Sequence, residues 1–318
     1  MARNRRPLHH FLAPRWWPWW LGLGLLRVSV ALPYRLQMAL GRAAGRVAHR
    51  MLAARRFVAR RNIEICFPEL DPGERDALVR RHFEALGCGV LEMAMAWWGR
   101  PARLDALVTL EGLEHLEAAL AHGRGAILFS AHFTPLEMSG RHLTARYEVD
   151  AMYRPSPENP LMNEILRRGR ERTARRTIAK DDVRAMLKSL RANVPVWYAP
   201  DQSYRRKYSA PVTFFGEHAM TNTATSRLSA LSGAPVLPFF IRRIGAAGGY
   251  VATIQPPLED FPGDDPVADT ERLNRAIEAQ VRLAPEQYYW VHRKFKARPE
   301  PWPDPYASPE TSGGAASR

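Results

Sequence analysis

The sequence predicts an α/β fold in which a mostly parallel sheet is flanked by helices, with a membrane-anchoring helix at its N-terminus. Short apolar runs alternate with helical patterns from about residue 108 onward. Residues 125–130 and 194–199 form nearly continuous apolar runs, as strands do when both faces of a sheet are covered. Such alternation is typical of parallel sheets that carry helices on both sides.

The first element is an apolar, tryptophan-rich segment at residues 16–33, in which Arg27 and Ser29 are the polar residues. A helix that crosses a bilayer needs about 20 apolar residues, so this segment is at the short end of the range. Its tryptophans belong at a headgroup interface. We therefore expect membrane attachment, through either a single span or an in-plane helix.

An arginine-rich segment follows, and after it a capped helix. Residues 34–61 have the pattern of an amphipathic helix, which either lies on the membrane or packs on the domain as a solvated helix. Asp71, Pro72 and Glu74 form an N-cap, a first-turn proline and a capping-box glutamate. These residues predict the start of a helix that runs towards residue 98.

The later elements alternate between helix and strand up to a tail rich in Pro, Ser and Gly, which is expected to be disordered. In chain order we expect a helix ending at Gly123, a strand at 125–130, a helix from Pro135, a strand near 149–153, two basic helices, a strand at 194–199, a helix at about 223–232, strands at 235–241 and 250–254, a helix with Leu273, Ile277 and Val281 on one face, and a last strand at 288–295. The chain thus divides into an anchor at 1–35, a globular domain at 36–300 and a tail at 301–318.

The chain is strongly basic. Its 318 residues include 46 Lys and Arg against 32 Asp and Glu, which gives a net charge of +14. Of the 46 basic residues 41 are arginine, a bias that can follow from a GC-rich genome alone. A surface of this charge nevertheless attracts phosphates, anionic lipid headgroups, nucleic acid or an acidic protein. No nucleic-acid-binding module is found, and Cys66 and Cys88 fit neither a metal site nor a disulfide framework. Since metal-ligand and phosphate-loop motifs are also missing from the sequence, we expect no metal and no cofactor.

The clearest candidate for catalysis is His132, which comes directly after the apolar run at 125–130. Ligands of open α/β sheets bind at the carboxyl ends of strands, where this histidine is expected to lie. Thr134 and Pro135 predict a helix start, and Glu137 falls in its first turn. Glu137 is expected to orient the imidazole of His132, which then acts as a general base. The alternative is that Glu137 only closes a capping box with Thr134.

Six blocks of sequence, which follow one another along nearly the whole chain, give this motif a context. They are FLAPRWWPWWLGLGLLR at 11–27, RRNIEICFPEL at 60–70, AHFTPLE at 131–137, MYRPSPENPLMNEIL at 152–166, VWYAPDQSY at 196–204 and EQYYWVHRKFKARP at 286–299. Together they resemble the late acyltransferases of lipid A synthesis, the lauroyl and myristoyl transferases. His132-x4-Glu137 looks like the H-x4-D/E motif of the larger glycerolipid acyltransferase superfamily.

The resemblance implies an O-acyltransferase with the fold of the glycerolipid acyltransferases. The donor would be an acyl-acyl carrier protein, and the acceptor the β-hydroxyl of an acyl chain on a Kdo-lipid A precursor. Lauroyl is favoured as the transferred chain, with myristoyl as the other choice. The protein would lie at the bacterial inner membrane with its catalytic domain on the cytoplasmic side. Its positive charge suits the acidic carrier and the phosphorylated acceptor.

Three further residues are candidates for substrate binding. Arg154 follows a predicted strand and suits a phosphate, unless it is a plain surface arginine. Arg170 resembles a Gly-Arg of the family, although a solvated helix face explains it equally. Asp201 ends a strand and suits a substrate contact or an orienting group, with a turn-forming aspartate as the alternative. Ser203 departs from the acidic residue that the family pattern has there, and His292 is expected to be structural.

Two other functions fit parts of the sequence. One is a glycerophospholipid acyltransferase of the same superfamily, acting on a lysophospholipid. The other is a basic membrane-bound protein that binds anionic lipid or nucleic acid without catalysis. The tryptophan-rich block and the WVHRKFK block argue against a lysophospholipid acyltransferase. The sequence contains no nucleic-acid-binding module, which argues against the binding protein.

Overall fold

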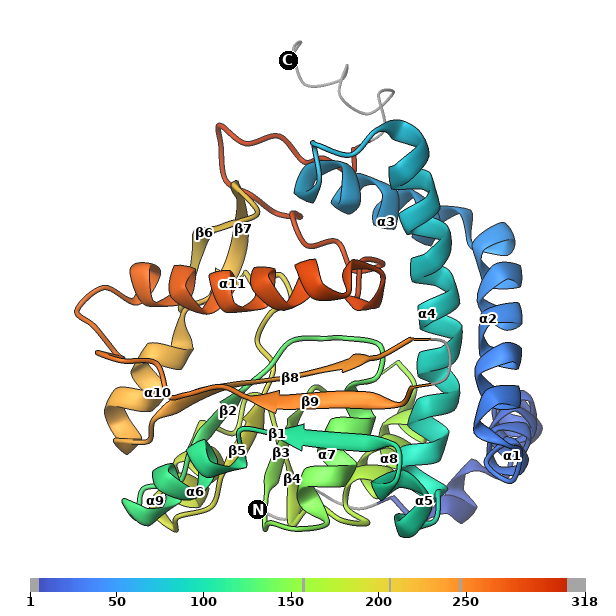
Figure 1. Ribbon diagram of the computed structural model, residues 1–318, viewed down its shortest axis with the longest axis horizontal. Coiled ribbons are helices and arrows are strands. Elements are labelled where there is room, and N and C mark those ends of the chain that lie inside the picture. Colours follow the sequence, from blue (N-terminus) through green and yellow to red (C-terminus); the bar gives the residue numbers. More distant parts are fainter. Residues whose placement is uncertain (1–5, 156–157, 206, 246–247, 308–318) are drawn as a thin grey trace.

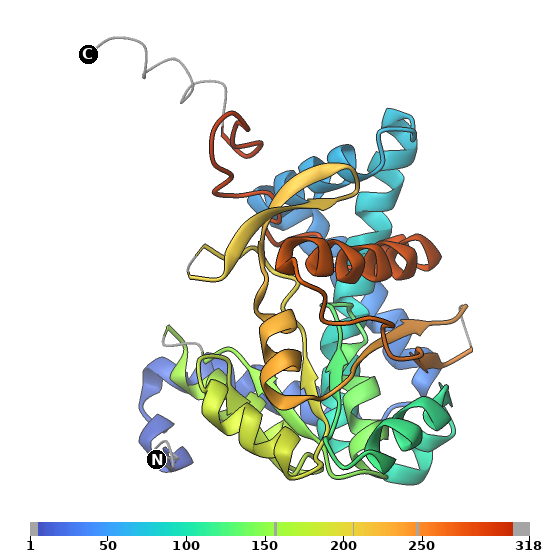
Figure 2. The same ribbon diagram turned by 90° about the vertical axis from the view of Figure 1, so that its left-hand side faces the viewer.

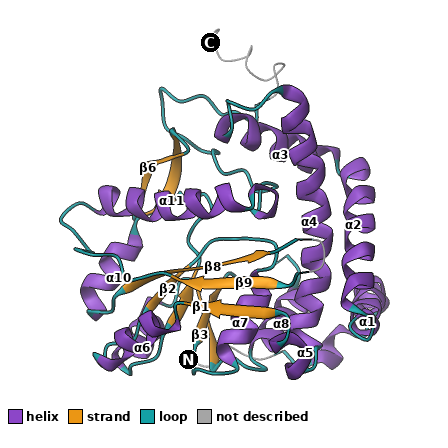
Figure 3. Cartoon of the chain, in the orientation of Figure 1, coloured by secondary structure: helices purple, strands orange, loops and turns teal. Residues whose placement is uncertain are grey.

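A seven-stranded sheet forms the centre of the fold in the computed structural model, which describes residues 6–155, 158–205, 207–245 and 248–307 (Figures 1 and 3). Its strands lie in the order β1 (Val108–Glu111), β9 (Tyr250–Ile254), β8 (Val236–Arg243), β2 (Ile127–Phe129), β5 (Val196–Tyr198), β3 (Asp150–Tyr153) and β4 (Arg176–Ala179). Neighbours from β8 to β4 are parallel, whereas β9 pairs antiparallel with β8 and parallel with β1. The mostly parallel sheet is therefore confirmed.

Helices cover both faces of the sheet, as the continuous apolar strands predict. On one side lie α6 (Leu113–Ala121), α7 (Leu136–Thr144) and α8 (Pro160–Arg170), and on the other α9 (Val183–Arg191), α10 (Ala224–Ser232) and α11 (Pro266–Leu283). Side chains alternate between the two faces along each strand. Leu128 therefore packs in the core under α6, α7 and α8, while Ile127 and Phe129 pack in the core under α9, α10 and α11. The short helix α5 (Pro101–Asp105) precedes β1.

A long helix, α4 (Pro72–Trp98), stands at the edge where the parallel strands end (Figure 1). Its predicted capping box is confirmed, since Asp71 accepts from the Glu74 backbone N–H at 2.8 Å and the Glu74 carboxylate accepts from the Asp71 N–H at 2.9 Å. The outer face of α4 packs against α2 (Tyr34–Met51). Glycines allow this close approach, because a Cβ on Gly41 would lie 2.7 Å from the Cys88 Cα.

The N-terminal segments differ from the expectation in one respect. The short 3-10 helices η1 (Leu8–Phe11) and η2 (Pro14–Trp16) lead into α1 (Trp17–Ser29). The single helix predicted at 34–61 is two helices, α2 and α3 (Ala53–Cys66), because Leu52 leaves the helical region with a ψ of 63°. Within the described residues, no helix is both long and apolar enough to cross a membrane.

The C-terminal third also departs from the sequence pattern. The strand predicted at 288–295 is wrong, since η3 (Pro285–Gln287) is followed by irregular turns. The hairpin of β6 (Ser209–Phe214) and β7 (Glu217–Asn222) was not expected. It lies outside the seven-stranded sheet and packs against α11 (Figure 2). The predicted tail is packed as far as residue 307, with a buried Tyr306 that donates to Asn62. The rest of the tail, 308–318, lies outside the described residues.

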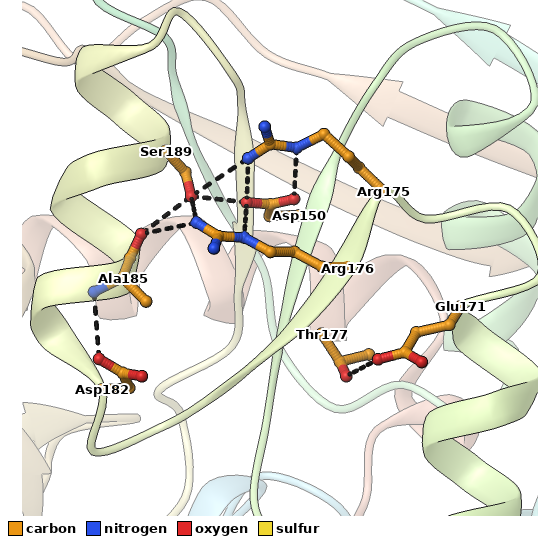
Figure 4. Close-up of polar contacts among 8 residues, drawn as sticks. All are labelled: Asp150, Glu171, Arg175, Arg176, Thr177, Asp182, Ala185 and Ser189. Atoms are coloured by element: carbon orange, nitrogen blue, oxygen red, sulfur yellow. Dashed lines mark hydrogen bonds and ion pairs between the residues drawn. The ribbon is translucent and has the colours of Figure 1, made fainter. Parts of the chain in front are cut away.

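The opposite edge of the sheet, where the parallel strands begin, is held by a buried carboxylate (Figure 4). Asp150 at the start of β3 is fully buried and accepts hydrogen bonds from Arg175, Arg176 and Ser189 at 2.5–2.9 Å. Burial favours the neutral form of this carboxyl, but the hydrogen bonds from the two arginines and Ser189 lower the pKa of Asp150 below its ordinary value. The contacts connect β3 and β4 to α9, so this edge is structural. Strand β4, which was also not expected, is short and begins with one of these arginines.

Candidate active site

His132 lies at the carboxyl end of β2, as the sequence predicts. Its side chain is 35% exposed, whereas that of Asp201, beside it, is 2% exposed. The imidazole Nδ1 is 2.5 Å from the Asp201 Oδ1, and the His132 backbone N–H donates to the Oδ2 at 3.0 Å. An ionised carboxylate only accepts, so Nδ1 carries a proton and Nε2 is left as the basic nitrogen.

Asp201 is the centre of a buried polar cluster behind the imidazole. The Tyr288 hydroxyl donates to its Oδ2 at 3.1 Å, and the Lys294 ammonium donates to its backbone carbonyl at 2.6 Å. Burial by itself would raise the pKa of Asp201, but the charge and hydrogen bonds of His132, aided by Lys294, lower it to about 2. The carboxylate is therefore ionised at neutral pH and stabilises a proton on the imidazole.

Glu137 does not orient His132, contrary to the prediction. Its carboxylate accepts from the Arg170 Nη2 at 2.5 Å, from the Arg170 Nε at 3.0 Å and from the Trp97 Nε1 at 3.2 Å. The capping alternative is also wrong, because α7 begins after Pro135 and has no side-chain cap. Four residues separate His132 from Glu137 in the chain, but the turn at 134–135 directs the glutamate towards α8 instead.

Arg170 reaches Glu137 because α8 and α4 approach closely at Gly169. A Cβ on Gly169 would lie 2.5 Å from the Trp97 ring. The Arg170 guanidinium also lies 5.5 Å from the centroid of Trp197, where a cation–π interaction is favourable. The Gly-Arg pair thus shapes the wall of the site, which excludes the solvated-face alternative for Arg170.

A large cavity of about 600 Å³ opens in front of His132. Leu86, Val90 and Met93 of α4 form one wall. Its polar and aromatic lining includes Glu137 of α7 and Arg170 of α8, together with residues at the strand ends and in the loops: His132, Arg154, Lys180, Asp181, Ser203, Tyr204 and Tyr289. Asp201 does not belong to this lining and is buried. Its expected contact with substrate is therefore replaced by an orienting contact with His132.

Arg154 and Lys180 are cationic residues of the cavity wall, and Lys180 is paired with Asp181 of the same wall at 3.3 Å. Arg154 is exposed and follows β3, and Lys180 follows β4 and lies 5.5 Å from the Tyr204 ring centroid. Both side chains lie at the carboxyl ends of neighbouring strands, which explains why they line one cavity. Cationic groups at this position suit phosphates or carboxylates.

A narrow apolar slot continues from the cavity between α4, α7 and α8. The two spaces share Leu136, Glu137, Arg170 and Trp197 in their walls. Farther in, the slot is lined by Gly140, Leu143, Val149, Ala151 and Phe239. A side chain added at Gly140 would meet nothing within 4 Å, so space remains there.

The remaining residues of the site include some that sequence reasoning did not select. Tyr288 and Lys294 belong to the block at 286–299, whose family resemblance was the available signal. His292 accepts from the Ser203 N–H at 3.2 Å, and burial together with the Lys296 charge lowers its pKa to about 4, which agrees with a structural role. Among the described residues, no cluster of His, Cys, Asp and Glu could hold a metal ion.

The sequence is similar to those of known acyltransferases of lipid A biosynthesis. A family model described as "Bacterial lipid A biosynthesis acyltransferase" matches residues 6–297. The lipid A biosynthesis lauroyltransferase of Escherichia coli K12 is 37% identical over 93% of this chain and 96% of its own length. The palmitoleoyltransferase of that strain is 38% identical over 91% and 94%, and the myristoyltransferase is 26% identical over 91% and 90%. The crystal structure of the 1-acyl-sn-glycerophosphate acyltransferase PlsC from Thermotoga maritima aligns with 76% of this chain and 99% of that chain, at 14% identity and a TM-score of 0.37.

Proposed function

The chain belongs to the bacterial lipid A biosynthesis acyltransferase family, and from this premise we propose that His132 catalyses transfer of a fatty acyl chain from an acyl-acyl carrier protein to a Kdo-lipid A precursor. The acceptor is the β-hydroxyl of an acyl chain already on the precursor. The observation that carries the proposal is that His132 lines a large cavity while the buried Asp201 behind it holds its Nδ1.

The reaction needs one base and no covalent enzyme intermediate. The Nε2 of His132 takes the proton of the acceptor hydroxyl while its oxygen attacks the thioester carbonyl carbon. The C–S bond then breaks, and the departing carrier thiolate takes the proton back from the imidazolium. Asp201 holds Nδ1–H throughout and stabilises the imidazolium between the two steps. The products are an ester and the free carrier thiol.

Arg154 and Lys180 would bind the anionic part of the acceptor. Both line the cavity of His132, and neither belongs to the buried cluster that orients the base. Glu137 and Arg170 would instead keep the junction between cavity and slot in shape. Their hydrogen bonds pair two opposite charges beside the slot. Either charge would be costly to bury there without its partner.

The apolar slot would take the tail of the transferred acyl chain. Most of its lining is apolar, with Glu137, Arg141, Thr144, Arg170 and Thr173 as the polar residues, and it adjoins the cavity of His132. Lauroyl is the chain that we favour, in line with the lauroyltransferase at 37% identity, and the palmitoleoyltransferase at 38% makes that longer chain the second candidate. A myristoyl chain is less favoured, since the relative named for it is 26% identical.

The protein would act at the bacterial inner membrane with its catalytic domain on the cytoplasmic side. The support is the exposed apolar surface of the N-terminal helices, where Trp17, Leu21 and Leu25 of α1 are 61%, 67% and 64% exposed. Contiguous apolar surface of this kind marks an interaction with a membrane or a partner.

Mass spectrometry of lipid A from cells that lack the gene tests the proposal. The deletion should lose one secondary acyl chain, the wild-type gene should restore it, and His132→Ala should not. The mass of the restored chain gives its length. Unchanged lipid A in the deletion, with no redundant enzyme present, would contradict the acceptor and direct attention to lysophospholipid acylation.

A further inference from the structure

A second concave surface, which we call the basic hollow, lies between α2, α3 and α4. It is lined by Arg46, His49, Arg50, Arg56, Arg80 and Glu84. None of these residues lines the cavity of His132. The hollow therefore needs an explanation of its own.

Positive charge in the basic hollow is mostly uncompensated. Glu84 is the single acidic residue of its lining and forms an ion pair with Arg46 at 3.1 Å. In the part of the chain that the structure describes, Arg50 and Arg80 have no ion-pair partner. Burial and the charges of Arg56, Arg80 and Arg50 lower the pKa of His49, as expected in a region of positive potential.

Part of the hollow is also rigidly arranged. The Arg56 Nη1 donates to the backbone carbonyls of His49 and Arg50, so its guanidinium is fixed across the junction of α2 and α3. The His49 ring packs edge-to-face on Phe83 with 5.3 Å between the centroids. A fixed guanidinium next to two unpaired ones suits the several oxygens of a phosphate.

Exposed apolar side chains lie on the same helices, α2 and α3, that form part of the basic hollow. Along α2 they are Leu36, Leu40, Val47 and Met51, with exposures of 44%, 46%, 53% and 75%. Leu52 between the two helices is 49% exposed, and Phe57 of α3 is 42% exposed. The α2 residues follow one another at helical spacing and form a single stripe beside Arg46 and Arg50. This combination of an apolar stripe and a cationic flank is the pattern of a helix lying in the headgroup region of a bilayer.

We propose that the basic hollow binds the phosphate of an anionic glycerophospholipid headgroup while Met51 and Phe57 enter the membrane interface. This inference rests on the membrane location given under the proposed function. An acidic protein surface would also match the charge, but it would not account for the neighbouring stripe of exposed aliphatic side chains.

The position of the hollow gives such binding a purpose. Arg80 and Val90 lie on the same helix, ten residues and about 15 Å apart along its axis. Val90 is 48% exposed and lines the cavity of His132. A headgroup held at Arg80 would therefore keep the cavity close to the membrane surface, where the lipid acceptor resides.

Vesicle binding by the full-length protein tests the proposal. The variant Arg50→Gln/Arg80→Gln is compared with Arg184→Gln/Arg191→Gln, which removes the same charge from exposed residues of α9 on a distant surface (Figure 1). On vesicles of phosphatidylcholine mixed with phosphatidylglycerol, the first variant should bind about 25-fold more weakly than wild type, about fivefold per arginine. The α9 variant should change by about twofold or less, because its charges lie beyond the screening length from the surface.

Two additional arms decide the nature of the site. Arg50→Lys/Arg80→Lys keeps the charge but removes the planar guanidinium forks, so an intermediate loss supports a built phosphate site. Equal losses in the hollow and α9 variants would overturn the proposal in favour of diffuse attraction. Unchanged vesicle binding with a raised KM for the acyl carrier protein would overturn it in favour of an acidic protein partner.

The outcome is separable from the proposed reaction. Acyl transfer in neutral detergent micelles should be retained by Arg50→Gln/Arg80→Gln, since the hollow shares no residue with the cavity. His132→Ala should show the reverse pattern, with wild-type vesicle binding and no transfer. Loss of transfer by His132→Ala without any effect of the hollow variants on vesicles would reject this inference and leave the reaction standing.

Discussion

His132 and Asp201 are 69 residues apart in the chain, yet their side chains share a hydrogen bond of 2.5 Å. They meet because β2 and β5 are neighbouring parallel strands, with Phe129 opposite Tyr198 in the register. Each residue follows its strand by a short step and so lies at the same edge of the sheet. The carboxylate is buried and ionised, while the imidazole faces the cavity. This division of environments suits an orienting group and a base.

Asp201→Asn tests this assignment. The amide cannot hold Nδ1–H as an anion does, so the imidazole loses its favoured tautomer and its stabilised charged form. We expect kcat to fall by about 10²–10⁴-fold with little change in KM. Steady-state kinetics with an acyl-acyl carrier protein donor measures it.

Glu137→Gln is the matched variant, since it also replaces a carboxylate by an amide. It weakens the contact with Arg170 but leaves the His132–Asp201 pair intact, so it should act mainly on KM. A large loss of kcat in Glu137→Gln, with near-normal kcat in Asp201→Asn, would show that the motif glutamate orients the base after all.

At the scale of elements, the approach of α7 and α8 to the sheet creates the slot that would hold the acyl tail. Gly140 on α7 and Gly169 on α8 have different roles in it. Gly169 is required by the Trp97 ring that packs on it, whereas Gly140 borders open space. A specificity change should therefore be sought at Gly140.

Gly140→Leu should shorten the chain that the enzyme prefers. A Cβ at this position meets nothing within 4 Å, and the rest of the leucine side chain would take up space in the slot that Gly140 lines. Leucine also has a better helix propensity than glycine. Competition between acyl carrier proteins loaded with chains of different length measures the effect. Gly140→Ala should show a smaller shift in the same direction. An unaltered preference in a stable Gly140→Leu protein would mean that the acyl chain lies elsewhere.

The edge opposite the site predicts a stability effect. Asp150→Ala removes the carboxylate that joins β3, β4 and α9, and leaves two arginines and Ser189 without their acceptor (Figure 4). We expect the free energy of unfolding to fall by about 2–4 kcal/mol, below the largest values for buried pairs because both arginines reach solvent. Urea unfolding measures the change.

The exposed pair of Arg60 and Asp76, with side chains 47% and 42% exposed, gives the control. Asp76→Ala should cost less than about 1 kcal/mol. Comparable losses in the two variants would show that the Asp150 cluster contributes no more than a surface ion pair.

Two histidines in the described part of the chain, the fully buried His82 and the partly buried His292, have strongly lowered pKa values and are held neutral by the fold. Burial lowers the pKa of His82 to about 4 despite the hydrogen bond of its Nδ1 with the Glu286 carbonyl, and His292 is lowered similarly. A lowered pKa in the folded state means that the unfolded chain binds more protons between about pH 6.5 and pH 4. The contribution of these histidines to the free energy of unfolding is therefore fully present above pH 6.5 and decreases as the pH falls towards 4.

His82→Gln should reduce this acid sensitivity. The amide retains a donor for the Glu286 carbonyl and does not titrate, so the loss of unfolding free energy between pH 7 and pH 5 should shrink by about 2 kcal/mol. Thermal or urea unfolding at both pH values gives the comparison. Equal pH dependence in wild type and variant would show that His82 is not held neutral by the fold.

Local sequence patterns were enough to predict several parts of the molecule. The apolar runs at 125–130 and 194–199 became β2 and β5, and the capping box at Asp71 started α4. His132 was predicted at its strand end. These features depend on periodicity, chain-local hydrogen bonds and burial, which neighbouring residues determine.

The partners of the site residues depended on contacts between distant segments. Asp201, Tyr288 and Lys294 surround the base only because β2, β5 and the turns after η3 come together in space. The spacing of His132 and Glu137 in the sequence did not reveal that their side chains have different partners. Glu137 pairs with Arg170 because α8 packs on α4 at Gly169. Side-chain pairing across the fold is a matter of geometry and desolvation, and neither is encoded within a window of a few residues.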